Sequence, residues 1–294
     1  MEFSLTVAPE VAEPVLHVFR GVGARIAVEQ EGGWSPEEGE APPPHTPVTV
    51  RAYLPVTRTL RSRRSRIDIA LRLLSLITPL PPVVERPIRE EEWERAWRAG
   101  FLPLQIGRLL VCPPWEVRTP GPGQVRLLLE PGLAFGTGHH PTTRLCLLWL
   151  QEVLAPGQRV LDLGTGSGIL AIAAALLGAG EVLALDIDPQ AVRAARHNVR
   201  LNGLQGRVLV RRGSLPWPQG GRFHGVLANL SARALCELAP ALGQALEGGG
   251  WLLASGVLAE QRRGVEEALG RAGFPPPRVR AEGEWLALLT HRPP

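Results

Sequence analysis

The sequence of 294 residues contains no lysine, and all 32 of its basic side chains are arginines. The protein therefore carries no lysine ε-amine of its own that could be modified. With 28 acidic residues, its formal net charge is +4. A charge this small on a chain of this length does not indicate a protein that binds nucleic acid.

Cysteine is scarce as well, and its three residues, Cys112, Cys146 and Cys236, lie far apart in the chain. They form no C-x-x-C pair. An odd, widely spaced set is typical of reduced thiols in a protein core rather than of disulfides or a zinc site.

Long apolar segments are absent too. The longest apolar stretch, residues 169–177, is far shorter than the roughly 20 residues that a membrane-spanning helix needs. The first five residues have neither the basic region nor the apolar run of a secretion signal. We therefore expect a cytoplasmic protein that does not interact with a membrane.

The chain is long enough for two domains, and its pattern changes near residue 100. Over residues 1–87, short stretches of alternating apolar residues are separated by segments with helical spacing, which predicts a smaller α+β domain of ferredoxin-like β-α-β-β-α-β plan. Residues 88–100 are charged and predict a linker helix. The predicted strands are 3–7, 25–29 and 48–54, and the predicted helices are 10–19 and 61–77.

Over residues 101–294, apolar strands alternate with helices. This order indicates an α/β fold, a doubly wound Rossmann-like sheet that is mainly parallel and covered by helices on both faces. The predicted strands are 159–163, 181–186, 207–210, 223–228, 251–255, 278–281 and 285–290. The predicted helices are 144–150, 170–177, 189–201, 232–246 and 260–272.

A glycine-rich turn, running from Gly164 through Gly166 to Gly168, follows the first of these strands and precedes a helix. Glycines let the backbone turn sharply and approach a ligand closely, because they have no Cβ. Ile169 stands where the dinucleotide fingerprint has its third glycine, which disfavours a nicotinamide dehydrogenase and favours a ligand without a pyrophosphate. A tight turn that binds no ligand is the alternative.

Two acidic residues follow the next strand. Asp186 ends that strand, where a carboxylate can accept hydrogen bonds from both hydroxyls of an adenosine ribose. Asp188 precedes Pro189 at the start of a helix, so we interpret it as an N-cap rather than a ligand-binding residue. Together with the glycine-rich turn, Asp186 predicts nucleoside binding.

Residues 130–143 contain three glycines and two prolines and predict a tightly turned loop that leads into a helix. Such a helix start attracts carboxylates through its N–H groups and hydroxyls, whereas plain helix capping by Thr142 and Thr143 is the alternative. The adjacent His139 and His140 point apart and have no Cys or acidic partner at ligand spacing. We therefore predict no metal site.

Asn229 lies at the end of the fourth strand, beside the point where ligands bind in open α/β sheets. Its carboxamide offers an uncharged acceptor that can orient an incoming amine, which makes Asn229 the candidate catalytic residue. Capping of the next helix is the alternative, and the two roles can coexist.

In order and spacing, these motifs resemble those of the bacterial ribosomal protein L-eleven (L11) methyltransferases. The resemblance rests on residues 132–143 (GLAFGTGHHPTT), the turn at Gly164, residues 186–189 (DIDP) and residues 228–230 (ANL). Residues 92–97, 114–116 and 282–285 are also similar to that family's linker, entry strand and C-terminal segment. The likeness is clear from about residue 90 to the end and weak over the first 85 residues.

The resemblance implies a class I methyltransferase that uses S-adenosyl-L-methionine and grips L11 with its N-terminal domain. The implied activity is trimethylation of the α-amino group and of lysine ε-amino groups. The cofactor-binding positions that match the family's motifs are Thr143, Gly164, Asp186 and Asn229. The general class I pattern adds Asp162 and Gly166 near the methionine moiety.

Three other functions were compared with the sequence. An RNA methyltransferase would use the arginines near the N-terminal helix, although a solvated helix face is the preferred interpretation, and a protein-glutamine enzyme would carry Pro-Pro where Leu230 and Ser231 stand. A non-catalytic nucleoside-binding protein that docks on a ribosomal partner is disfavoured by the joint presence of Thr143, Asp186 and Asn229. We expect L11 as the partner and no direct contact with nucleic acid. The arginines in question are Arg58, Arg61, Arg63, Arg64, Arg66 and Arg72.

Overall fold

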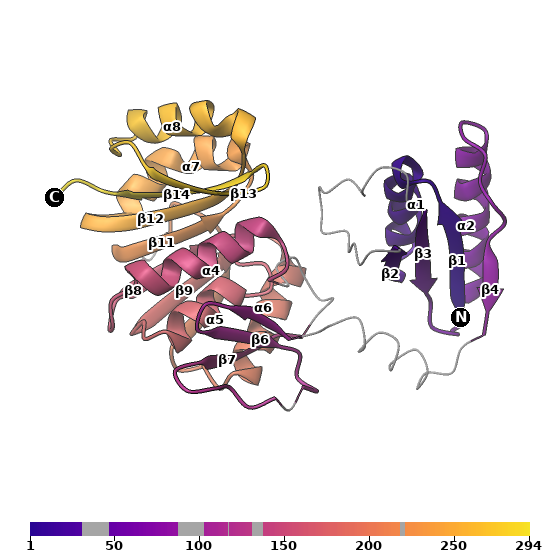
Figure 1. Cartoon of the computed structure of the whole chain (residues 1–294), viewed down its shortest axis with the longest axis horizontal. Helices are drawn as coiled ribbons and strands as arrows, with labels where there is room; N and C mark the ends of the chain where they lie inside the picture. The colour runs from indigo at the N-terminus through magenta and orange to yellow at the C-terminus, as the bar shows by residue number, and fades with distance from the viewer. Residues whose placement is uncertain (31–46, 88–102, 117, 131–137, 218–220) are drawn as a thin grey trace. The chain divides into compact units, whose positions relative to one another are not determined.

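The computed structural model describes residues 1–30, 47–87, 103–116, 118–130, 138–217 and 221–294. The chain divides into two compact units, Met1–Phe101 and Leu102–Pro294, which we describe separately (Figure 1). The predicted linker helix at 88–100 lies outside the described residues.

The N-terminal unit contains a four-stranded antiparallel sheet in the order β2-β3-β1-β4, together with two helices. This is the ferredoxin-like order that the sequence predicts. The elements are β1 (Glu2–Val7), α1 (Pro9–Gly21), β2 (Arg25–Gln30), β3 (Val48–Tyr53), α2 (Leu60–Ser75) and β4 (Val84–Arg86).

The core of this unit follows from the alternation of apolar residues. Every second residue of β1 and β3 is apolar and buried, and these residues form one cluster with Ile67 and Leu71 of α2. The sequence predicts that this helix extends to Ile77, and this is wrong. The helix ends at Ser75 and Ile77 is 85% exposed. Pro79, two residues further on, cannot continue a helix, so Ile77 does not reach the core.

The C-terminal unit is built on a seven-stranded sheet in the order β10-β9-β8-β11-β12-β14-β13. The first five strands are parallel, and β14 runs antiparallel to both of its neighbours, which confirms the Rossmann-like prediction. The strands are β8 (Arg159–Leu163), β9 (Glu181–Asp186), β10 (Val208–Arg212), β11 (Phe223–Asn229), β12 (Leu246–Leu258), β13 (Arg278–Glu282) and β14 (Trp285–His291).

Helices cover both faces of this sheet (Figure 1). The first face packs against α4 (Pro141–Val153), α5 (Ile169–Leu176) and α6 (Pro189–Leu201), and the second against α7 (Ala232–Ala245) and α8 (Arg262–Arg271). Side chains alternate between the faces along each strand. Val160 of β8 therefore belongs to the first cluster and Leu161 to the second.

A second, three-stranded sheet was not predicted from the sequence. It consists of β5 (Leu104–Ile106), β6 (Leu109–Cys112) and β7 (Val125–Leu128), and its buried residues join the cluster of α4 and α5. Strands of three or four residues are too short to show a clear alternation. Residues 114–116, which resemble the family's entry strand, follow β6: this strand ends at Cys112, and Pro114 and Trp115 form a turn.

The three cysteines are free, and two of them are buried, as the sequence predicts. Burial raises the pKa of the Cys146 thiol to about 12, which keeps it protonated and unreactive. None of the helices within the described ranges combines the length and apolar character that crossing a membrane requires.

Candidate active site

The candidate site lies where the strand order of the large sheet reverses. The first strand of this sheet along the chain, β8, pairs with β9 on one side and with β11 on the other, all in parallel. Their carboxyl ends therefore meet at one edge of the sheet. This edge brings together the glycine-rich turn after β8, Asp186 at the end of β9 and Asn229 at the end of β11.

Asp186 clamps the glycine-rich turn. Its Oδ2 accepts a hydrogen bond from the backbone N–H of Gly166 at 2.9 Å, and its Oδ1 accepts one from the N–H of Asp188 at 2.9 Å. The side chain is only partly buried, and each carboxylate oxygen has a second lone pair that it can offer to a ligand. The carboxylate is thus held in one orientation and still accessible.

The turn itself requires glycine. Gly164 and Gly166 have φ values of +73° and +54°, a region that favours glycine. A Cβ on Gly164 would also collide with the side chain of Leu230, which follows Asn229. The turn after β8 and the end of β11 are therefore packed directly against each other.

Asp188 caps α6, as predicted. Its Oδ1 accepts a hydrogen bond from the N–H of Gln190 at 2.8 Å, and Pro189 occupies the first position of the helix. This leaves Asp186 as the acidic residue of β9 that faces the site.

Asp162 is buried within β8, with 1% of its surface exposed. Its Oδ2 accepts hydrogen bonds from the Thr165 hydroxyl at 2.6 Å and from the N–H of Ala171 at 3.1 Å. Its Oδ1 is also buried and has no hydrogen-bond partner among the described residues. Burial raises the pKa of this carboxyl to about 7, and the charge of Asp186 adds to the rise.

The start of α4 is capped by His140, so the alternative that Thr142 and Thr143 serve as caps is wrong. The N–H of Thr142 donates to Nδ1 of His140 at 3.3 Å, and the N–H of Thr143 donates to the carbonyl of His140 at 3.1 Å. Pro141 has no N–H. The backbone donors of this first turn are thus already engaged, and the Thr142 and Thr143 hydroxyls are the groups that it offers to other side chains.

Both hydroxyls contact the candidate catalytic residue. Nδ2 of Asn229 donates to Oγ1 of Thr142 at 3.2 Å and to Oγ1 of Thr143 at 3.4 Å. The next helix, α7, is capped by Ser231, whose Oγ accepts from the N–H of Ala234. The alternative that Asn229 caps α7 is therefore wrong, and the structure joins Asn229 to Thr143.

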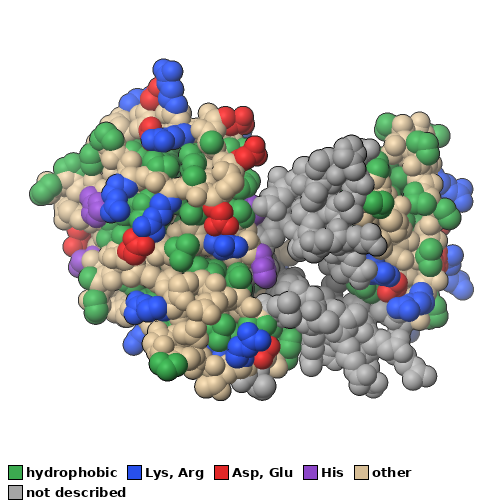
Figure 2. Space-filling view, in the orientation of Figure 1, with side chains coloured by type: hydrophobic (Ala, Val, Ile, Leu, Met, Phe, Trp, Pro, Cys, Tyr) green, Lys and Arg blue, Asp and Glu red, His purple; other side chains and the backbone are tan. Residues whose placement is uncertain are grey.

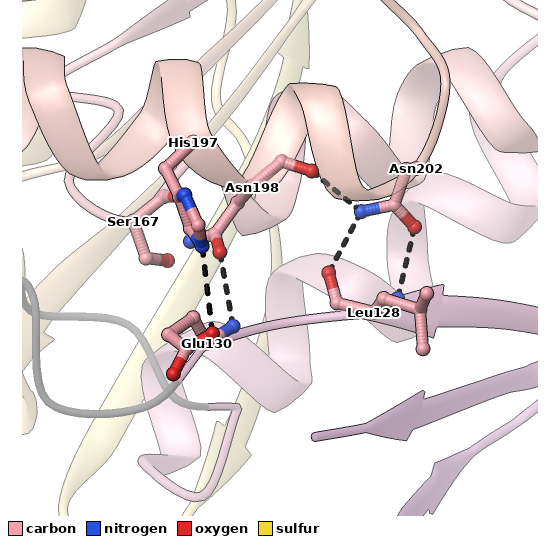
Figure 3. A network of polar contacts seen from close by, with 6 residues as sticks. All are labelled: Leu128, Glu130, Ser167, His197, Asn198 and Asn202. Carbon is pink, nitrogen blue, oxygen red and sulfur yellow. Dashed lines mark hydrogen bonds and ion pairs between the residues drawn. The ribbon is translucent and has the colours of Figure 1, made fainter. Parts of the chain in front are cut away.

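Two further asparagines, Asn198 within α6 and Asn202 at its C-cap, were not predicted from the sequence (Figure 3). Asn198 is fully buried, and its amide joins the carbonyl of Ser167 in the glycine-rich turn, at 2.8 Å, to the N–H of Glu130, at 2.9 Å. One turn later, Asn202 bonds both backbone groups of Leu128, at 2.9 and 2.7 Å. These side chains fix the last described residues before the 131–137 segment, which lies outside the described ranges. For Asn198 the signal in the sequence is an Asn on the apolar face of an amphipathic helix, whereas Asn202 stands at the end of that helix.

Within the described ranges, no three His, Cys, Asp or Glu side chains come together as metal ligands would. The imidazole of His140 is engaged with another residue. Its Nδ1 lies 2.7 Å from Oγ1 of Thr142.

Comparison with known proteins agrees with this geometry. The family model described as ribosomal protein L11 methyltransferase matches residues 1–293. The ribosomal protein L11 methyltransferase of Chloroflexus aurantiacus is 41% identical over 322 residues, covering 100% of this chain and 98% of the relative. The protein of the same name from Pelotomaculum thermopropionicum is 38% identical and covers 99% of this chain and 98% of the relative.

Among solved structures, the ribosomal protein L11 methylase of Lactobacillus delbrueckii subsp. bulgaricus is similar to this chain with a TM-score of 0.60 and 36% identity. The match covers 64% of this chain and 96% of that one. The match of the family model over nearly the whole length, together with these relatives, shows that the protein is an S-adenosylmethionine-dependent methyltransferase. The chain belongs to the ribosomal protein L11 methyltransferase family.

Proposed function

We propose that the protein transfers methyl groups to amines of ribosomal protein L11, namely its α-amino group and lysine ε-amino groups. The observation that carries this proposal is the position of the Asn229 carboxamide. It is held by two threonine hydroxyls at the strand edge that also bears the clamped glycine-rich turn. An acceptor for an amine N–H thus lies beside a site suited to a nucleoside.

The residues at this edge fit S-adenosylmethionine, which supplies the methyl group as part of a sulfonium ion. Asp186 can accept hydrogen bonds from the ribose hydroxyls. Gly164 and Gly166 have no Cβ, so the cofactor can approach their backbone closely. The buried Oδ1 of Asp162 has no hydrogen-bond partner within the described part of the chain, and an ammonium group would satisfy it. We assign Asp162 and the Thr143 hydroxyl to the methionine end.

The nucleophile is the neutral amine, so the protein must receive or create a deprotonated nitrogen. A free α-amine, with a pKa of about 7.7–8.0, is partly neutral near pH 7. A lysine amine has a pKa of about 10.4, so losing its proton at pH 7 costs roughly 4–5 kcal/mol. Desolvation in the site lowers that cost. No conventional base is required. Asn229 orients the amine, because its carboxamide oxygen accepts a hydrogen bond from one of the amine N–H groups.

We further propose that the partner is L11, free or in the large ribosomal subunit, that the protein acts in the cytoplasm and that it makes no direct contact with nucleic acid or a membrane. Two arginines of α2 already have partners, because Arg64 pairs with Glu85 at 3.0 Å and Arg66 donates to the carbonyl of Gly21 at 3.0 Å. On the face of the C-terminal unit drawn in Figure 2, basic and acidic side chains are interspersed. Neither feature resembles a basic patch for phosphates.

The test is methyl transfer from radiolabelled S-adenosylmethionine into separated ribosomal proteins and ribosomal RNA of an unmethylated strain. Label confined to amines of L11 supports the proposal, and label in RNA overturns it. The Asn229→Ala variant measures the role of the carboxamide, and normal turnover by this variant would exclude Asn229 as the catalytic residue.

A further inference from the structure

A chain of four side chains from three elements leads away from the candidate catalytic residue. Asn229 of β11 donates to Oγ1 of Thr142 at 3.2 Å, and that oxygen lies 2.7 Å from Nδ1 of His140. The imidazole of His140 meets the ring of Trp285 of β14 edge-on, with centroids 4.8 Å apart and an interplanar angle of 69°. Both Thr142 and His140 are buried, at 1% and 3% exposure.

The proton positions along this chain follow from the helix cap. Nδ1 of His140 lies 3.3 Å from the backbone N of Thr142 in the place of a helix-cap acceptor, so we assign the tautomer that carries no proton on Nδ1. In this tautomer the hydroxyl of Thr142, at 2.7 Å from the same nitrogen, is a second hydrogen-bond donor to the lone pair of Nδ1. The lone pairs of Oγ1 are left to accept a hydrogen bond, and the group that donates to them is the NH2 of Asn229.

This order decides which way the Asn229 amide points, a choice that carboxamide geometry alone leaves open. A flipped amide would place Oδ1 against a hydroxyl oxygen whose only proton is already directed at His140. The helix start reinforces the order, because a proton on Nδ1 would face the N–H groups and the positive end of the α4 dipole. The edge contact with Trp285 holds the imidazole in the plane that the cap needs.

We propose that His140 and Thr142 are positioning residues for methyl transfer, which lock Asn229 with its NH2 directed inward and its Oδ1 left to accept an N–H from the substrate. This inference rests on the proposed function, and it makes the function more specific. In the first two transfers the site receives a nitrogen that still bears hydrogen, and the hydrogen bond from this nitrogen to Oδ1 exists only while a hydrogen remains.

Successive methylation of one nitrogen therefore divides into two kinds of step. In each transfer a nitrogen–carbon bond forms as the sulfur–carbon bond breaks, the positive charge passes to nitrogen and a neutral thioether leaves. After the first and second transfers the ammonium loses a proton to water, and the nitrogen can react again. Neutral primary and secondary amines have an N–H for Asn229, whereas the tertiary amine that enters the third transfer has none.

The test compares single-turnover rates on unmodified L11 with those on L11 whose amines were first dimethylated by reductive methylation. We expect Thr142→Val to slow the first two transfers roughly five- to tenfold, the effect of one lost hydrogen bond, and to leave the third at the wild-type rate. Thr142→Ser, which restores the hydroxyl, recovers most of the loss. The matched control is Thr290→Val, which removes another buried threonine hydroxyl, bonded to the carbonyl of Pro275 and remote from the site.

Two measurements on His140 complete the test. In His140→Asn the carboxamide oxygen can occupy the place of Nδ1, so this variant should recover most of the rate that His140→Ala loses. If the imidazole acted as a base, asparagine would not recover it. In the cofactor-free protein, 15N spectra of labelled histidine should show His140 without a proton on Nδ1, with its signal identified by its loss in His140→Asn.

Equal slowing of all three transfers by Thr142→Val, or a proton on Nδ1 of His140, overturns the proposal. Equal rates for wild type and Thr142→Val on unmodified L11 overturn it as well. If the wild-type protein transfers no methyl group to either form of L11, the proposed function itself fails. That outcome is distinct, because the 15N spectra still report the proton positions.

Discussion

Replacing Asp162 by asparagine should make the stability of the cofactor-free protein less dependent on pH. Burial is the main reason that the pKa of this carboxyl rises from 3.8 to about 7. The hydrogen bonds from Thr165 and Ala171 oppose the rise, and the charge of Asp186 adds to it.

The sign of the effect follows from the direction of the shift. Because the pKa is higher in the folded protein, the folded state keeps a proton that the unfolded chain has already lost. The stability that this carboxyl contributes is complete below about pH 4 and is lost as the pH rises to about 7. A shift of about three units corresponds to roughly 4 kcal/mol, of which roughly 3 kcal/mol falls between pH 5 and pH 8.

The carboxamide of the Asp162→Asn variant does not ionise, and its oxygen can still accept from Thr165 and Ala171. Its NH2 has a cost of its own, but that cost is the same at every pH. The quantity to measure is therefore the change, between pH 5 and pH 8, of the difference in free energy of unfolding between variant and wild type. This change can be measured by urea unfolding followed by tryptophan fluorescence. Between pH 5 and pH 8, we expect the variant to gain about 3 kcal/mol in free energy of unfolding relative to the wild type.

The control is Asp188→Asn, because asparagine caps a helix as well as aspartate does and Asp188 is exposed. The difference in free energy of unfolding between Asp188→Asn and the wild type should change by less than about 0.5 kcal/mol between pH 5 and pH 8. A similarly small change for Asp162→Asn would refute a buried carboxyl with a raised pKa.

The Asp162→Asn variant should also bind S-adenosylmethionine roughly tenfold more weakly than the wild type, as measured by calorimetry at pH 8. Unchanged affinity would refute the assignment of Asp162 to the methionine end.

Three further substitutions test other parts of the site. Asp186→Ala removes the carboxylate that bonds the glycine-rich turn, and it should weaken binding of both adenosine and S-adenosylmethionine by roughly tenfold or more. Weaker binding of S-adenosylmethionine alone would contradict a contact between Asp186 and the ribose. Asn198→Ala removes the buried amide that bonds the carbonyl of Ser167 and the N–H of Glu130, and the loss of these two hydrogen bonds should lower the free energy of unfolding by roughly 2–4 kcal/mol. A loss below about 0.5 kcal/mol in urea unfolding would contradict its bridging role. Gly256→Ala places a Cβ against the carbonyl of Leu230 at a φ of +85°, so thermal unfolding should occur several degrees lower. An unchanged midpoint would contradict this close packing beside Asn229.

Much of the catalytic unit could be predicted because its signals are local. A strand, a glycine-rich turn and an apolar helix follow one another directly in the chain, and Asp186 ends the next strand. The carboxyl ends of parallel strands share one edge of a sheet, so the side chains at these ends could be expected to meet. The structure places them together, and Asp188 caps α6 as its position before Pro189 predicts.

The errors and omissions concern properties that depend on distant residues. The predicted end of α2 is wrong, and the sheet of β5, β6 and β7 is absent from the prediction. The conformation of such short strands depends on the core against which they pack. His140 was considered only as a possible metal ligand, yet its ring caps α4 and contacts Trp285, a residue of the last strand.

The order of amino acids is thus sufficient for the fold class, for the turn that only glycine can adopt and for the acidic residue at the end of β9, since each depends on neighbours within a few positions. The tertiary structure decides the state of the polar groups. The pKa of Asp162, the direction of the Asn229 amide and the bridge made by Asn198 arise when segments far apart in the chain exclude water together. A buried polar group must then find its partner in whichever segment lies against it.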